Sequence, residues 1–135
     1  MSFPLFVMWL WVILPVQLLQ DIQKLDHEWI MLAHAAYEEA DANNIDPEKF
    51  IHLIACESRF KTDAEGDYRK ETREYMAYGL LQWWRTSWRY YTIKYGFKGD
   101  YYSPADQIHL AVLVISKEKR GIRNWYNCGR ASGFF

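Results

Sequence analysis

The sequence lacks the short patterns from which zinc and cofactor sites are usually built. It contains only two cysteines, Cys56 and Cys128, and no Cys-x-x-Cys pair, so a cysteine zinc signature is excluded. His27-Glu28 is followed by His34, which is not the spacing of a His-Glu-x-x-His zinc helix. Phosphate-binding glycine loops and dinucleotide fingerprints are also missing. We therefore expect neither a metal nor a cofactor.

Charge of one sign is not in excess, because the net charge is −1. Residues 1–60 carry 9 acidic and 3 basic side chains, a balance of −6, whereas residues 61–135 carry 8 and 13, a balance of +5. The simpler interpretation is a dipolar surface, and the other is a basic wall that faces an anionic polymer. The basic residues accompany no nucleic-acid-binding motif, so we expect no nucleic-acid partner.

The N-terminal residues 3–19 carry no charge, and their length is at the short limit of a membrane span. A signal peptide is the other export interpretation, although a Lys/Arg-rich start and a small-x-small cleavage site are missing. A buried N-terminal helix is the alternative to both. We expect residues 1–20 to be an export or anchor segment, with membrane association through residues 3–19. Residues 21–135 would then be a domain outside the cytoplasm.

Helical spacing dominates the rest of the chain, and strand signals are weak. Apolar side chains recur at three- and four-residue steps and predict an amphipathic helix that Asn43-Asn44 ends. Asp46-Pro47 is typical of an N-cap followed by proline in the first turn, so a second helix should run from about Pro47 to Ser58. The stripe of the first helix consists of Ile22, Leu25, Trp29, Leu32, Ala33, Ala36 and Ala40.

The remaining residues predict a polar loop and two further helices. Residues 61–77 are polar and charged, with Gly66 as the expected turn, and a small hairpin is an open alternative there. Aromatic side chains at helical steps from Trp84 to Tyr95 predict one helix, which Gly96 should end, and Ser103-Pro104 begins another. The fold class we expect is mainly α, a compact helical domain with one exposed loop or small hairpin.

One carboxylate lies where the helical pattern requires an apolar side chain. Phe50, Leu53 and Ile54 form the stripe of the second helix, and Glu57 follows on the same face. A lone buried carboxylate is costly to ionise, so its pKa should be raised. A carboxylic acid that keeps its proton near neutral pH suits general-acid catalysis of glycoside cleavage. The alternative is that Glu57, near the helix end, turns to solvent or pairs with Arg59 or another arginine.

Four short motifs follow one another between residues 57 and 129. In order, they are Glu57-Ser58-Arg59-Phe60, Gly79-Leu80-Leu81-Gln82, Pro104-Ala105-Asp106-Gln107-Ile108 and Tyr126-Asn127-Cys128-Gly129. Together they resemble the motifs of goose-type lysozymes and soluble lytic transglycosylases, which are Glu-Ser, Gly-Leu-Met-Gln or Gly-Leu-Leu-Gln, Pro-x-x-Asn-Ile and Tyr-Asn-x-Gly. The third match is looser, since Gln107 stands where asparagine is usual, and Ala77 stands where many relatives carry serine.

The resemblance implies a lysozyme-like (α+β) fold and an enzyme that cuts the glycan strand of peptidoglycan outside the cytoplasm. Glu57 would protonate the glycosidic oxygen between N-acetylmuramic acid and N-acetylglucosamine. Contacts with substrate are implied for Ser58, Gly79, Leu80, Gln82, Tyr126 and Asn127. In the family fold the segments around Cys56 and Cys128 approach each other, so a disulfide between them and two free thiols are both open.

The resemblance leaves three activities to weigh. Lytic transglycosylases need one carboxylate, because the C6 hydroxyl of muramic acid attacks internally, whereas lysozymes need a second one. The candidates are Asp63, Glu65, Asp67, Glu71 and Glu74. Their crowding in one hydrophilic stretch is typical of a solvated loop, which favours the transglycosylase. A non-catalytic glycan-binding module, or one that anchors an envelope or phage assembly, is the third alternative, and the presence of Glu57 disfavours it.

The aromatic residues between Trp83 and Tyr102 are open to two interpretations, since sugar rings stack on aromatic faces but most such residues fill cores. We expect the larger share of them to lie in the core.

Overall fold

The computed structural model describes residues 16–135, with side chains described at Gln20 and from His27 onward. The chain divides into two compact units, residues 1–31 and residues 32–135. The predicted export segment lies largely outside the described residues. Within the described part, no helix is both long enough and apolar enough to cross a membrane.

Helix α2 extends from Val16 to Ala42, so it begins before the expected domain boundary at residue 21, and that boundary stays a prediction. In the first unit its described side chains, which include Trp29 and Met31, are exposed. In the second unit Ala36 and Ala40 are fully buried, as the predicted stripe requires. Small side chains at these steps let the helix pack closely against the core.

Helix α3 extends from Pro47 to Ser58, as predicted. The Asp46 carboxylate accepts a hydrogen bond from the backbone N–H of Lys49 at 3.1 Å and caps the helix. Proline occupies the first turn, where its missing N–H costs nothing. The helix ends at Arg59, which adopts a left-handed conformation with φ 53°.

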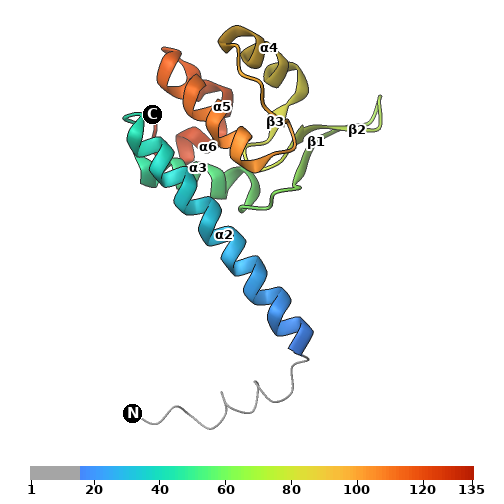
Figure 1. Cartoon of the computed structure of the whole chain (residues 1–135). Coiled ribbons are helices and arrows are strands. Elements are labelled where there is room, and N and C mark those ends of the chain that lie inside the picture. Colours follow the sequence, from blue (N-terminus) through green and yellow to red (C-terminus); the bar gives the residue numbers. More distant parts are fainter. Residues whose placement is uncertain (1–15) are drawn as a thin grey trace. The chain divides into compact units, whose positions relative to one another are not determined.

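The polar segment after α3 forms a hairpin, which resolves the alternative in favour of strands. β1 (Glu65–Arg69) pairs antiparallel with β2 (Glu74–Tyr78), and β2 pairs with the short β3 (Trp83–Trp84). Figure 1 shows the β1–β2 hairpin extending away from the neighbouring helices. The expectation of a turn at Gly66 is wrong, because Gly66 lies in β1 opposite Ala77 and the strands are joined by residues 70–73.

The C-terminal half is helical. α4 (Arg85–Tyr95) ends at Gly96, whose φ of 62° favours glycine. α5 (Pro104–Lys117) begins at Ser103, whose hydroxyl accepts from the backbone N–H of Asp106 at 3.2 Å. A 3-10 turn, η1 (Gly121–Trp125), and a short helix, α6 (Tyr126–Ala131), complete the chain. The expected mainly α class with a small hairpin is confirmed.

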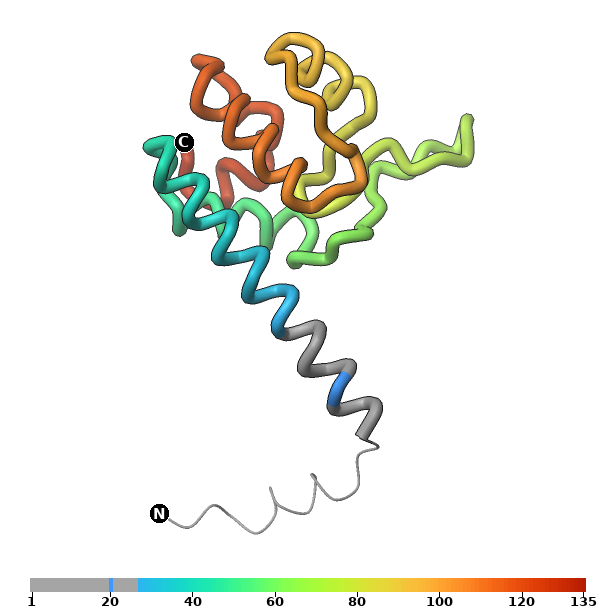
Figure 2. Tube along the Cα trace, in the orientation of Figure 1, coloured from blue at the N-terminus to red at the C-terminus, as the bar shows by residue number. Residues whose placement is uncertain are grey.

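One hydrophobic core joins the elements of the second unit, from the end of α2 to η1. The C-terminal residues of the chain lie near the start of α3, since a Cβ at Gly133 would be 3.7 Å from Lys49 Cε. Figure 2 shows this end beside the turn between α2 and α3. A disulfide between Cys56 and Cys128 ties α3 to α6, which resolves the cysteine alternative.

Candidate active site

Glu57 lies near the C-terminal end of α3, one turn beyond fully buried residues. Phe50, Leu53 and Ile54 of its stripe are each 0% exposed, and Glu57 itself is half-buried. The Glu57 side chain therefore lies at the edge of the core, neither fully exposed to solvent nor fully buried. In residues 16–135 we find no hydrogen bond or ion pair from its carboxyl group, and the alternative of pairing with Arg59 is not observed.

The environment of Glu57 favours the protonated acid. Burial, the larger cause, and the negative charge of Asp67 together raise the pKa of Glu57 from 4.5 to about 7. A carboxyl group with this pKa is protonated in a large fraction of molecules near neutral pH. It can donate a proton to a leaving oxygen and, once ionised, accept one back.

Asp67 is the carboxylate that acts on Glu57, and Trp84 holds it. Its Oδ2 accepts a hydrogen bond from Trp84 Nε1 at 2.8 Å, and the Arg69 guanidinium lies over the Trp84 ring at 5.2 Å from the centroid. The contact connects the hairpin to β3. Asp67 is thus a positioned carboxylate among the five that the sequence suggested, and its position follows from the hairpin rather than from local spacing.

The second motif forms a tight turn between β2 and β3 that Gln107 of α5 supports. The buried amide of Gln107 accepts from Leu81 N at 3.1 Å and donates to Tyr78 O at 3.1 Å and Tyr101 O at 2.9 Å. Gly79 has φ 83°, and a Cβ there would collide with the Gln107 amide. Glycine is therefore required at position 79 by this internal contact. In the sequence, Gln107 stood out only because asparagine is usual at this position of the third motif. Its role in holding the turn between β2 and β3 appears only in the tertiary structure.

Gln82 uses its side chain within the protein. Its Nε2 donates to Ala64 O and to Gly79 O, both at 3.0 Å, so the amide joins the turn to the start of the hairpin. A Cβ at Gly66 would collide with Gln82 Oε1, which explains why a glycine stands in this strand. The predicted contact of Gln82 with sugar stays a prediction.

Two further predicted contact residues are buried. Leu80 is 0% exposed and packs in the core, so any contact with substrate would have to run through its backbone. Ser58 is 8% exposed, and its hydroxyl donates to Ile54 O at 3.3 Å. The side chains of both residues therefore have structural roles, and the implied contacts of Ser58 and Leu80 with substrate stay predictions.

The fourth motif lies on α6, next to the acid-bearing helix. The disulfide joins Cys128 of this motif to Cys56, the residue that precedes Glu57. Tyr126 is half exposed, with its ring 5.4 Å from that of Phe135, and Asn127 is exposed. The structure brings Glu57 and the fourth motif to one region, and the roles of Tyr126 and Asn127 there stay predictions.

The aromatic residues between Trp83 and Tyr102 are divided between core and surface, even where they are neighbours in the sequence. Trp83 is 2% exposed, and its ring makes edge contacts with Trp88 and Trp125. Trp125 Nε1 donates to Leu81 O at 2.7 Å and so also supports the turn between β2 and β3. Trp83 is therefore a core residue, whereas the neighbouring Trp84 is only partly buried and faces the hairpin.

Two adjoining hollows lie beside the sheet, with volumes of about 110 and 390 Å³. Both are lined by Glu65, Tyr75 and Arg85, and we call them together the Arg85 hollow. The smaller part is completed by Ala77, Tyr78, Tyr101 and Tyr102, and the larger part by Glu74 and Met76. The smaller part therefore borders the residues that directly precede Gly79.

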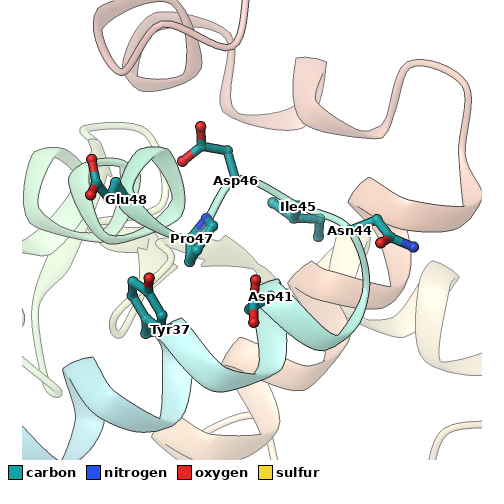
Figure 3. A pocket seen from close by; sticks show the side chains of 7 residues that line it. All are labelled: Tyr37, Asp41, Asn44, Ile45, Asp46, Pro47 and Glu48. Carbon is teal, nitrogen blue, oxygen red and sulfur yellow. The ribbon is translucent and has the colours of Figure 1, made fainter.

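A separate open hollow of about 620 Å³ lies at the turn between α2 and α3 (Figure 3). It is lined by Tyr37, Asp41, Asn44, Ile45, Asp46, Pro47 and Glu48. Glu48 precedes Glu57 by nine residues on α3, which corresponds to about 14 Å along the helix axis. This hollow is therefore not part of the Glu57 site. In residues 16–135, no group of three or more histidine, cysteine, aspartate or glutamate side chains could hold a metal ion.

The half-buried acid, the turn held by Gln107 and the disulfide-linked C-terminal motif lie in a mainly α domain with a small hairpin, consistent with a lysozyme-like fold. Residues 34–131 match the family of the transglycosylase SLT domain, and the chain belongs to this family. Neither a curated protein nor a solved structure gives a significant match. The match covers all four motifs, and the predicted resemblance is confirmed. Membership of this family supports a peptidoglycan glycosidase or transglycosylase activity at the level of the family.

Proposed function

We propose that this protein is a peptidoglycan lytic transglycosylase that cuts the β-1,4 bond between N-acetylmuramic acid and N-acetylglucosamine, with Glu57 as its single general acid and base. The observation that carries the proposal is the half-buried carboxyl group of Glu57 at the end of a buried stripe, with a pKa of about 7. Membership of the transglycosylase SLT domain family supports the substrate class.

The reaction would use the Glu57 carboxyl group twice, first as an acid and then as a base. Protonated Glu57 donates its proton to the glycosidic oxygen, the bond to C1 of muramic acid breaks, and positive charge develops on that sugar ring. The resulting Glu57 carboxylate then accepts the proton of the C6 hydroxyl as this oxygen attacks C1. The products are a free N-acetylglucosamine end and a 1,6-anhydromuramic acid end, so no water is consumed.

Asp67 supports a second candidate, a lysozyme-type hydrolase. It is a carboxylate near enough to raise the pKa of Glu57, and Trp84 fixes its position. A second carboxylate could activate water or stabilise the charged sugar, and the product would then be reducing muramic acid. In a transglycosylase, the same carboxylate of Asp67 would serve only to keep the proton on Glu57.

The test is mass spectrometry of purified peptidoglycan digested by the full chain, by Glu57→Gln and by Asp67→Asn. Anhydromuramic products from the parent, absent with Glu57→Gln and retained with Asp67→Asn, would support the proposal. Reducing products that disappear with Asp67→Asn would favour the hydrolase. Absence of cleavage by the parent would leave the glycan-binding or assembly module as the better interpretation.

We further propose that the protein acts outside the cytoplasm, in the cell envelope or in a phage particle, where peptidoglycan is accessible. The uncharged residues 3–19 support export or membrane association. Fractionation of cells that produce the full chain would test this, since a protein found only in the cytosolic fraction would contradict it.

A further inference from the structure

We propose that the Arg85 hollow binds the zwitterionic end of an amino-acid side chain, with an ammonium and a carboxylate on one carbon, in the peptide attached to muramic acid. This inference rests on the proposed function and deepens it, because it assigns the protein a preference among peptidoglycan peptides. The ligand chemistry is that of diaminopimelate, in contrast to lysine, which ends in an ammonium group alone.

Arg85 is held in place by two tyrosines. Its guanidinium lies 5.0 Å from the ring centroid of Tyr101 and 5.4 Å from that of Tyr102, and it donates a hydrogen bond to the Tyr102 hydroxyl. The Tyr78 ring packs edge-on against Tyr102 at 5.0 Å. A guanidinium has five N–H donors, so an arginine fixed in this way keeps donors for an incoming carboxylate.

Hydrogen bonds also fix Tyr78 and Tyr101, which line the smaller part of the hollow. Gln107 donates to the backbone oxygens of both residues, and the Tyr101 hydroxyl donates to Trp83 O. A site whose walls are held by internal hydrogen bonds loses little conformational freedom on binding. The tyrosine side of the hollow is therefore preorganised.

The opposite charge in the hollow comes from the sheet. Glu65 lines both parts and lies opposite Tyr78 in the β1–β2 register, and Glu74 lines the larger part. Neither carboxylate forms an ion pair with Arg85 within 4 Å in residues 16–135, where the recorded ion pairs are Lys94–Glu118 and His109–Glu39. The hollow thus keeps separated positive and negative groups.

Separated charges select a ligand that carries both. A ligand with an ammonium alone can pair with a glutamate but leaves Arg85 without a partner, and a ligand with a carboxylate alone can pair with Arg85 but is repelled by the two glutamates. A zwitterionic end satisfies both walls. The larger part, about 390 Å³, is within the size range of small-ligand sites.

The hollow is placed to receive a substituent of the glycan. Glu65 and Asp67 lie two residues apart on β1, and the charge of Asp67 acts on Glu57. Ala77 and Tyr78 connect the hollow to the Gly79 turn. A peptide of three residues spans about 10 Å when extended, so its third side chain can reach beyond the sugar that Glu57 acts on.

The experiment is isothermal titration of the full chain with two probes, muramyl tripeptides whose third residue is meso-diaminopimelate or lysine. The variants are Arg85→Gln and Glu65→Gln, and Arg89→Gln is the control because Arg89 is exposed on the same helix and lines neither part of the hollow. The parent should bind the diaminopimelate probe about tenfold more tightly, the effect of one charge-assisted hydrogen bond pair. Arg85→Gln should remove this preference, Glu65→Gln should weaken both probes, and Arg89→Gln should change neither.

Equal binding of the two probes by the parent, or binding of neither, would overturn the proposal without any variant. Loss of both probes to the same extent with Arg85→Gln, in a protein that melts like the parent, would also overturn it. Cleavage of peptidoglycan without a preference for either probe would refute this inference and leave the proposed function standing. A preference for the diaminopimelate probe without cleavage would do the reverse.

Discussion

Two polar side chains lie on otherwise apolar helix stripes, Glu57 on α3 and Gln107 on α5. Gln107 is 1% exposed, both of its amide N–H groups donate to backbone oxygens, and its amide oxygen accepts from a backbone N–H. Glu57 is half-buried, has no such partners in residues 16–135, and has a pKa raised to about 7. The same break in an amphipathic pattern has two different consequences.

The difference is one of hydrogen-bond satisfaction. A buried amide whose donors and acceptor are all paired fixes the neighbouring backbone and has no capacity left for a ligand. A carboxyl group that is desolvated without partners keeps its proton and can give it away. Gln107 therefore supports the turn, and Glu57 is left chemically available beside it.

The largest expected effect is on the rate of glycan cleavage when Glu57 is replaced. Glu57→Gln keeps the shape of the side chain but removes the transferable proton, so the rate of glycan cleavage should fall about 1,000-fold. The measurement is release of soluble muropeptides under single-turnover conditions. Glu48→Gln is the matched control, since Glu48 is an exposed carboxylate on the same helix, and it should stay within about twofold of the parent. A loss of less than tenfold with Glu57→Gln would break the comparison.

Gln107, whose amide has its hydrogen-bond partners, should contribute to stability rather than to catalysis. Gln107→Ala would leave Leu81 N, Tyr78 O and Tyr101 O without their partner and open a cavity, so the free energy of unfolding should fall by about 3 kcal/mol. Urea unfolding followed by circular dichroism measures this. Ser116→Ala, an exposed polar side chain on α5, should change the free energy by less than about 0.5 kcal/mol. Equal stability of the two variants would show that Gln107 does not support the turn.

The smallest expected effect is the pH dependence of stability due to Glu57. Because the folded state holds the Glu57 proton up to about pH 7, whereas the unfolded chain releases it near 4.5, stability falls as pH rises between these values. Glu57→Gln resembles the protonated form, so at pH 8 it should be more stable than the parent by about 1–2 kcal/mol, reduced for partial solvent exposure. The difference should vanish near pH 4. A constant difference across this range would mean that the pKa of Glu57 is not raised.

Local patterns in the sequence predicted much of the helical part. The bounds of α3 follow from the Asp46-Pro47 start, and the end of α4 follows from Gly96. These predictions succeed because capping and backbone conformation involve residues close in sequence. The stripe that ends in Glu57 was visible for the same reason, since helical spacing alone places it beside Leu53 and Ile54.

The contacts around the site could not be predicted in this way. Trp84 holds Asp67 from 17 residues away, and Gln107 supports Leu81 from 26 residues away. Gly66 was expected to form a turn because glycine is common in turns, but it pairs with Ala77 in the sheet, and the Gln82 side chain occupies the space that a Cβ at position 66 would need. Such contacts have no local period, so a pattern search does not find them.

The amino-acid sequence by itself determined the helices, the order of the four motifs and the position of one carboxyl group on an apolar stripe, because these depend on spacing along the chain. Only the tertiary structure decided that within residues 16–135 the Gln107 amide has hydrogen-bond partners and the Glu57 carboxyl group does not, that Asp67 rather than its neighbours acts on Glu57, and that Arg85 and two glutamates line one hollow. These properties depend on which side chains meet after the helices and the hairpin pack, and on how much water that packing removes.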